Sequence, residues 1–451
     1  MAADRAKSDL MTEGSIGRKL LVFCVPLILG NLLQQLYNTA DSVIVGNFVG
    51  SNALAAVGSS GALIYLLIAF SQGVSVGAGV VISHYIGADD KSNVSRAVHT
   101  SLAIVAIIGI VLTALGIALS AALLRLLNTP QEVFADSVTY LQIYFGGVLF
   151  NVVYNMAAGI LNAAGNSRRS LLYLAIASVT NIVLDLVCVA LLDMGVAGAA
   201  IATNVSQLLS CVLSLGYLMR VDAPYRVRIR SIRVDGRMAG NIIRIGLPTG
   251  VQNMVISLSN AVVQSSVNAF GADAMAGFGA YMKIDGFNIL PVLSLSLAMT
   301  TFTGQNLGAG KVERVKKGMR LTLMMGLCYT AATGALLLAF SAPLMRLFTD
   351  NAAAVSYGQL AMRYFCPFYF LLGVMHILAG TVRGAGKSVP PMVIMLMSLC
   401  VVRIAWLKLA APLYGKIDGV FVAYPITWAV GMGLMVVYAM FGKWLKLRTD
   451  Y

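Results

Sequence analysis

Residues 47–58 read NFVGSNALAAVG, and residues 268–279 read NAFGADAMAGFG, at an offset of 221 positions (268 − 47). The same offset relates HYIGA (84–88) to QNLGA (305–309) and AGILNAAGNS (158–167) to AGTVRGAGKS (379–388). Three pairs of segments in one register are not expected by chance. The chain is therefore predicted to consist of two related halves, and such internal repeats are typical of transporters.

The composition excludes a water-soluble protein. Of the 451 residues, 59% are hydrophobic and only 11% are charged, and the mean hydropathy is +0.83. Soluble domains carry about 25% charged residues. With about 20 apolar residues per membrane span, a chain of this length has room for roughly twelve spans. We therefore expect an all-α polytopic membrane protein.

Apolar runs separated by polar stretches predict twelve helices in two sets of six. The first set lies near 17–45, 58–86, 94–120, 132–162, 169–192 and 195–220, and the second near 239–268, 275–307, 317–341, 355–383, 389–412 and 417–444. The stretch VDAPYRVRIRSIRVDGR between the sets is rich in arginine. These boundaries predict an N-lobe (1–220), a basic linker (221–238) and a C-lobe (239–451).

Basic residues identify the cytoplasmic side. The formal net charge is +14, and one side of the predicted membrane holds most of the Lys and Arg, including the linker arginines. The other side holds only Arg125, Arg346, Arg363, Lys408 and Lys416. By the positive-inside rule both termini and the linker are cytoplasmic, in a bacterial or archaeal plasma membrane. Topology explains the charge without a nucleic-acid partner. Six spans per half give a pseudo-two-fold axis along the membrane normal, as in alternating-access transporters.

The sequence lacks the signals of several other classes of protein. The six cysteines fall inside apolar stretches without paired or ligand-like spacing, so neither disulfides nor a zinc site is expected. The first fifteen or so residues are polar and predict no removable signal peptide. No GxxxxGK[ST] nucleotide-binding loop or catalytic triad can be placed. We expect no enzyme activity and no cofactor.

Three acidic residues lie well inside predicted spans: Asp41, Asp185 and Asp285. An acid at mid-membrane costs about 2.5–3.5 kcal/mol on insertion scales, so each needs a reason. Polar residues of the N-lobe accompany the first two, namely Asn181 one turn before Asp185, and Thr203, Tyr140 and Asn155. Carboxylate, amide and hydroxyl oxygens suit Na⁺, and two nearby carboxylates also suit a shared proton. Alternatively, Asp41 and Asp185 only hydrogen-bond helices together.

The second half is not a copy of the first. The repeat register places Val262 or Val263 opposite Asp41, so we expect a one-sided ion site. A neutral stripe containing Asn253 lines a cavity or packs between helices. Lys283 and Asp285 lie two positions apart, which does not assure a direct pair. We interpret them as polar anchors in the cavity or with other helices, with a role in coupling as the alternative. His376 relays protons or satisfies a neighbouring carbonyl.

The sequence resembles the multidrug and toxic compound extrusion (MATE) family over nearly its whole length. The resemblance rests on PLILGNLLQQLYNTADSVIVGNFVG (26–50), NIVLD (181–185), GVAGAAIAT (195–203) and GQNLGAGK (304–311). The two N-lobe acids, without an acid on the seventh helix, are similar to the DinF-like branch. The resemblance implies two six-helix lobes around a cavity, and export of amphipathic, often cationic compounds against inward Na⁺ or H⁺.

The resemblance also assigns residues. The family's cation site falls on Asp41, Asn181, Asp185 and Thr203, which would be the Na⁺ ligands, with Tyr140 and Asn155 around them. Pro26 falls at the family's helix 1 proline, a plausible bending point because proline removes an in-helix hydrogen bond. Lys283, Asp285, His376 and Arg403 lie outside the transferred pattern.

Our hypothesis is that cation and substrate compete in the N-lobe of a monomeric antiporter surrounded by membrane lipids. The substrate-cavity candidates are Gln34, Tyr37, Asn151, Tyr154, Asn253, Lys283, Asp285 and His376. One alternative is a flippase for a lipid-linked or other anionic amphiphile, in which Lys283 and Arg403 would hold pyrophosphate. An ion channel is a further alternative, although the acid-poor second half does not predict a continuous polar pore.

Overall fold

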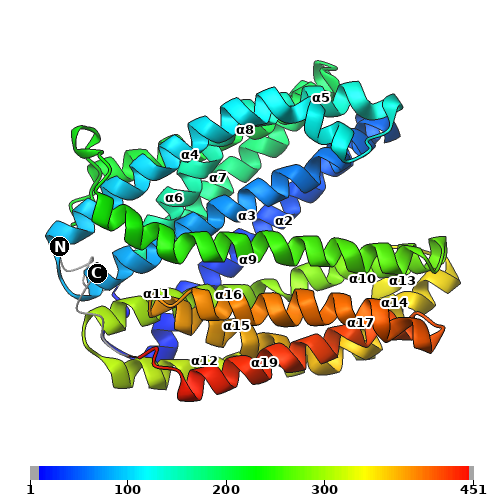
Figure 1. Cartoon of the computed structure of the whole chain (residues 1–451). Helices are drawn as coiled ribbons and strands as arrows, with labels where there is room; N and C mark the ends of the chain where they lie inside the picture. Colours follow the sequence, from blue (N-terminus) through cyan, green and yellow to red (C-terminus); the bar gives the residue numbers. More distant parts are fainter. Residues whose placement is uncertain (1–9, 446–451) are drawn as a thin grey trace. The chain divides into compact units, whose positions relative to one another are not determined.

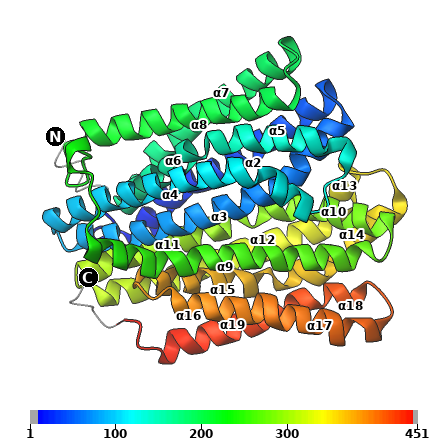
Figure 2. The same ribbon diagram turned by 45° about the horizontal axis from the view of Figure 1, so that its top comes forward.

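The computed structural model describes residues 10–445, and every regular element within that range is helical (Figures 1 and 2). The first helices are α2 (Ile16–Phe48), α3 (Ser51–Gly87), α4 (Lys91–Leu126), α5 (Gln131–Gly146), α6 (Val148–Ala163), α7 (Ser167–Asp185), the π-helix η1 (Leu186–Leu191) and α8 (Gly195–Arg220). The linker contains one short 3₁₀ turn, η2 (Ile229–Ser231).

The second set follows the same plan. It comprises α9 (Gly236–Asn268), α10 (Ala272–Asn288), α11 (Leu290–Gly308), α12 (Val312–Ala339), α13 (Ser341–Arg346), α14 (Ala352–Phe365), η3 (Cys366–Phe368), α15 (Tyr369–Gly384), α16 (Val389–Leu396), the π-helix η4 (Met397–Val402), α17 (Arg403–Leu409), η5 (Ala411–Tyr414), α18 (Asp418–Phe421) and α19 (Ala423–Phe441). Each of the twelve predicted spans corresponds to one of these helices or to a run of consecutive ones.

Ten helices in residues 10–445 are long and apolar enough to cross a membrane, and the bent pair α5/α6 makes eleven. The remaining predicted span is α9, a 33-residue helix interrupted by polar residues such as Arg244 and Asn253. The expected all-α polytopic fold is confirmed. The start of the second helix differs from the prediction: α3 begins at Ser51, not near 58. Ser59 and Ser60, which look like a break, donate hydrogen bonds to the Ala56 carbonyl inside the helix.

The chain packs as two units whose boundaries lie inside helices. The first unit consists mainly of Val25–Gly250, and the second contains Met11–Cys24 together with the chain after Gly250. Helix α2 thus begins in the second unit and continues in the first. Helix α9 begins in the first unit and continues in the second. Pro26 and Pro248, which are 222 positions apart (248 − 26), each lie within two residues of one of these transitions.

Within the first unit, α3 and the first half of α9 touch through glycines. A Cβ placed on Gly73 would lie 2.3 Å from the Gly250 Cα, and one on Gly77 would lie 2.5 Å from the Gly246 Cα. Real Cβ atoms do not approach backbone this closely. Small residues at helix contacts are the usual means of bringing membrane helices together, and here they set the spacing between α3 and α9.

The bend between α5 and α6 has a specific cause. These helices meet at Gly147 with a bend of 48°. The Gly147 N–H bonds the Tyr144 carbonyl, which leaves the Ile143 carbonyl without its usual helical donor. The Asn204 amide of α8 supplies that donor at 2.5 Å. A side-chain amide therefore satisfies the backbone group that the bend releases.

The second unit has an aromatic core. Phe365 is fully buried, and its ring centroid lies 4.3 Å from that of Tyr424 and 5.5 Å from that of Phe421. Trp428 packs against Tyr424 at 5.7 Å. These rings come from α14, α18 and α19 and pack the last two of these helices against the first.

Candidate functional site

Asp41 and Asp185 lie together in the first unit. Asp41 is on α2, and Asp185 is the last residue of α7. Their carboxyl groups are close enough to share one hydrogen-bonded proton. Asp185 is fully buried, and Asn181, one turn earlier on the same helix face, is 1% exposed. Residues 144 positions apart in the sequence (185 − 41) therefore form one buried polar cluster.

The oxygens of this cluster lack conventional donors. Both Asp185 carboxylate oxygens, one Asp41 oxygen and both amide atoms of Asn181 are buried without a hydrogen-bond partner among the described residues. Buried polar groups in native proteins are nearly always satisfied, so this concentration of unsatisfied ones in one place is unusual. A proton or a small cation is the species that such an acceptor-rich group can hold.

Tyrosines surround the carboxyl pair. Tyr140 on α5 lies within electrostatic range of both Asp41 and Asp185, and its ring stacks on that of Tyr144 with the centroids 6.4 Å apart. Tyr37, one turn before Asp41 on α2, is buried and lies close to the same group. These rings exclude water from the carboxylates while placing hydroxyl groups nearby.

The other two expected cation-site residues lie on neighbouring helices. Asn155 on α6 donates its amide to the Asn151 side-chain oxygen at 2.9 Å, so it binds within its own helix. Thr203 lies on α8, which packs against α7. Among the described residues, neither side chain hydrogen bonds to the two Asp185 oxygens. The role of Asn155 and Thr203 as ligands stays a prediction.

A π-helix follows Asp185 directly. The segment η1 spans Leu186–Leu191, and its wider turns interrupt the regular hydrogen-bond ladder of α7. Single π-turns inside α-helices occur frequently at functional sites because they re-aim side chains. Asp185 therefore lies at the junction between the α-helical and the π-helical backbone. Apolar periodicity does not reveal such a segment, and no feature of the sequence marked it.

The substrate-cavity candidates of the first unit lie beside other polar side chains. Tyr37 lies next to Gln34 one turn earlier, and Tyr154 lies next to Ser170 on α7. Asn151 is buried and accepts the Asn155 amide. Gln34 and Tyr37 therefore lie on the same face of α2 as the carboxylate of Asp41.

In the second unit, Asp285 is held by two tyrosines. The Tyr369 hydroxyl donates to the Asp285 carboxylate at 2.7 Å and the Tyr281 hydroxyl donates at 3.2 Å, while the two hydroxyl oxygens lie 2.7 Å apart. Trp428 stacks on Tyr369 with the ring centroids 6.0 Å apart. Asp285 is thus already satisfied, unlike the N-lobe pair. Tyr281 lies one helical turn before it, a spacing that could have identified one partner.

The other candidates of the second unit lie apart from Asp285. The Lys283 side chain is exposed, with its ammonium 5.9 Å from the centre of the Phe348 ring, so the two neighbours on α10 point in different directions. The His376 carbonyl accepts a hydrogen bond from Ser296, and the Asn253 carbonyl accepts one from Ser257. Their roles in a cavity stay predictions.

Arg403 is buried at the end of the second π-helix. It is 2% exposed and follows η4 directly. Its guanidinium donates to the Asn260 side chain at 2.9 Å and to the Thr427 hydroxyl at 3.5 Å. It also lies 4.7 Å from the centre of the Tyr424 ring. Aromatic and polar groups together stabilise this charge where no carboxylate contacts it among the described residues.

Comparison with known proteins agrees with the repeat. The MatE family model matches residues 26–187 and again residues 248–406. The two matches begin at Pro26 and Pro248, which are 222 positions apart (248 − 26). One family model therefore describes both halves of the chain.

Similar proteins span the whole chain. The probable multidrug resistance protein YpnP of Bacillus subtilis is 30% identical over 97% of this chain and 98% of its own length. The FAD transporter of Shewanella oneidensis is 27% identical over 92% of this chain and 93% of its own.

Solved structures share the fold. A MOP superfamily transporter from Pyrococcus furiosus aligns with a TM-score of 0.90 at 23% identity, covering 95% of this chain and 96% of that one. An outward-facing multidrug resistance MATE transporter aligns with a TM-score of 0.88 at 23% identity and the same coverage. With a family model covering both halves and a relative 30% identical along nearly its entire length, this chain belongs to the MATE family of integral membrane transporters.

Proposed function

We propose that this protein is a cation-coupled antiporter that exports amphipathic, often cationic compounds by alternating access. The supporting observation is the Asp41–Asp185 pair, whose buried oxygens lack donors. Two relatives that are similar over nearly their full length are named probable multidrug resistance proteins, which supports a broad range of small-molecule substrates.

The pair would serve as the coupling site for a physical reason. Two carboxylates buried side by side repel each other, and the repulsion is relieved by a proton shared between them or by a bound Na⁺. Asn181 would add an amide oxygen to such a site, and Thr203 a hydroxyl. In this proposal the ion is a transported species that enters from outside and leaves to the cytoplasm.

Coupling would pass through α2. Asp41 lies on this helix with Gln34 and Tyr37, so ion binding and substrate binding would act on one element. Pro26 lacks the N–H that would bond the Val22 carbonyl, which weakens α2 next to its passage between units. Ion binding would shift α2 about this point and release the substrate. A tenfold ion gradient supplies about 1.4 kcal/mol, enough for about tenfold substrate accumulation per ion.

The test uses purified protein in liposomes loaded with a fluorescent cationic dye. Na⁺ and pH gradients are imposed separately and together, and FAD serves as a second substrate because one relative is named for it. Dye efflux that accelerates with one gradient supports antiport and identifies the ion. Efflux of neither substrate under either gradient would contradict the proposal.

A further inference from the structure

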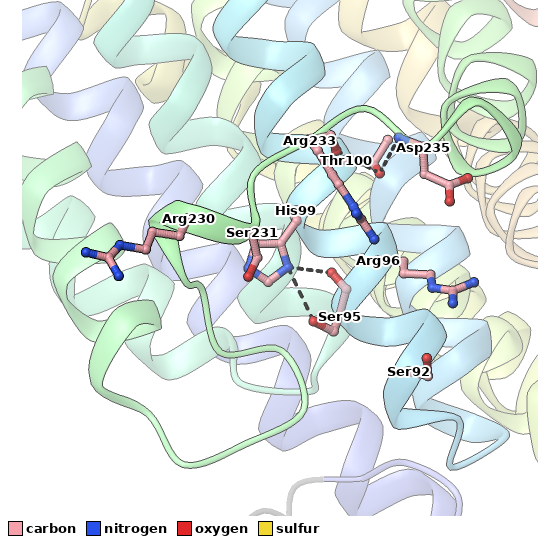
Figure 3. Close-up of a pocket in the computed structure, with 9 residues that line it drawn as sticks. All are labelled: Ser92, Ser95, Arg96, His99, Thr100, Arg230, Ser231, Arg233 and Asp235. Atoms are coloured by element: carbon pink, nitrogen blue, oxygen red, sulfur yellow. Dashed lines mark hydrogen bonds between the residues drawn. The ribbon is translucent and has the colours of Figure 1, made fainter.

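A polar pocket of the first unit lies between α4 and the linker. Neither Asp41 nor Asp185 lines it. It encloses about 470 Å³ and is lined from α4 by Arg96, His99 and Thr100 and from the linker by Arg230, Arg233 and Asp235 (Figure 3). The positive-inside rule places these residues on the cytoplasmic side. The proposed transport mechanism makes no use of this pocket.

The pocket is built by specific hydrogen bonds. The buried His99 ring donates through Nδ1 to the Ser95 carbonyl at 2.6 Å and accepts through Nε2 from the Arg228 backbone N–H at 2.9 Å. These two bonds fix the orientation of the ring and favour the tautomer with hydrogen on Nδ1. The Thr100 hydroxyl donates to the Arg233 carbonyl at 3.3 Å. The linker is therefore held on α4 by its backbone, and the Arg230 and Arg233 side chains line the pocket without taking part in that anchoring.

The lining has a surplus of positive charge. Arg96, Arg230 and Arg233 form no ion pair with a carboxylate in residues 10–445. The one acid, Asp235, accepts hydrogen bonds through one carboxylate oxygen from the backbone N–H groups of Arg237 and Met238, at the start of α9. In Figure 3 the Arg96 and Arg233 side chains lie on one side of His99 and Arg230 on the other.

The remaining lining groups favour an oxyanion. Ser92, Ser95 and Ser231 supply hydroxyls, and the N-terminal ends of α4 and α9 both border the pocket. Helix N-termini carry partial positive charge, and arginine forks match the geometry of phosphate oxygens. The volume falls within the range of about 300–1,000 Å³ that is typical of small-molecule sites, which leaves room for more than the phosphate itself.

We propose that this pocket binds a phosphate-bearing anion, either the headgroup of an anionic phospholipid or a free phosphate compound of the cytoplasm. Such a ligand would join Arg96 of α4 to Arg233 of the linker. It would thereby tie the linker to α4 immediately before α9 begins.

The experiment measures binding of two probes to the full-length protein purified in neutral detergent without phosphate. Inorganic phosphate is titrated by calorimetry at constant ionic strength, and retention of phosphatidylglycerol is compared with that of phosphatidylcholine by native mass spectrometry. The variants are Arg96→Ala/Arg233→Ala and, as a matched control, Arg228→Ala. The control removes a linker arginine whose side chain is outside the lining but keeps the backbone N–H that binds His99.

For the probe that matches the natural ligand, we expect at least about tenfold weaker binding by the double variant than by wild type. For the control variant we expect a change of less than about twofold. If the double variant loses binding of inorganic phosphate, the ligand is a free phosphate compound. If it loses retention of phosphatidylglycerol alone, the ligand is a lipid headgroup. Equal binding by wild type and double variant for both probes would overturn the proposal, as would an equal loss in Arg228→Ala. The single variants Arg96→Ala and Arg233→Ala repeat the test if the double variant does not elute as a single species.

Discussion

The backbone N–H of Met11 donates a 2.8 Å hydrogen bond to Oε1 of Gln305, joining the segment before α2 to the end of α11 in the second unit. The Met11 carbonyl accepts from the Asn306 amide at 3.3 Å and from two nitrogens of Arg314 at 3.2 Å each. Met11 itself is 1% exposed. The short segment ahead of α2 is thus anchored by its backbone, as the linker is anchored on α4.

Arg314→Ala should loosen this anchor. The substitution removes the bonds to the Met11 carbonyl and a 3.1 Å bond to the Glu13 carbonyl. We expect amide hydrogen exchange in residues 11–15 to accelerate at least about tenfold, since one lost bond to a charged group costs about 1.5–3 kcal/mol. Lys317→Ala, an exposed cation on the same helix, is the control. Unchanged exchange in Arg314→Ala would show that these bonds do not hold the segment.

Tyr369→Phe should destabilise the second unit. The Tyr369 hydroxyl is the closer of the two donors to the Asp285 carboxylate, and losing a hydrogen bond to a buried charged group costs about 1.5–3 kcal/mol. A lower midpoint of thermal unfolding in detergent is the expected result. Tyr357→Phe is the control, because among the described residues its hydroxyl makes no hydrogen bond. Equal midpoints for the two variants would mean that the Tyr369 bond contributes nothing.

Gly73→Ala should destabilise the contact between α3 and α9. The added Cβ would lie 2.3 Å from the Gly250 backbone, which cannot rotate away as a side chain can. Overpacking of this kind costs about 1–3 kcal/mol, so a smaller folded yield and a lower unfolding midpoint are expected. Gly61→Ala adds the same methyl group to α3 where nothing lies within 4 Å. If both alanine variants unfold like wild type, the close approach is not needed for packing.

Most predicted helices agree closely with the structure because most spans are long apolar runs with polar ends. The repeat extends further than the aligned segments indicated: Glu13 and Asp235, and Gly14 and Gly236, keep the 222-residue offset of the prolines. Glu13 and Gly14 belong to the anchored segment before α2, whereas Asp235 and Gly236 lie where the anchored linker meets the start of α9. The other residues of the two segments differ, so sequence alignment alone does not detect this part of the repeat. Each segment is anchored mainly through its own backbone groups, which do not depend on residue type.

The candidate site was partly predictable. Placing an acid inside an apolar span costs free energy, so Asp41, Asp185 and Asp285 stand out from their positions in the sequence alone. Whether an acid is satisfied depends on distant partners: Tyr369 reaches Asp285 from a helix 84 positions away (369 − 285), and no sequence spacing indicates that contact. The π-helix after Asp185 is likewise a packing feature without a sequence signal.

The central claim is that the Asp41–Asp185 pair couples ion movement to export. The most direct measurement compares gradient-driven dye efflux in liposomes for wild type, Asp41→Asn and the control Asp136→Asn, which changes an exposed acid of the same unit. Removing the Asp41 charge removes the repulsion that an ion relieves, so Asp41→Asn should lose acceleration by either gradient while Asp136→Asn keeps it. Wild-type acceleration in properly inserted Asp41→Asn protein would contradict the account.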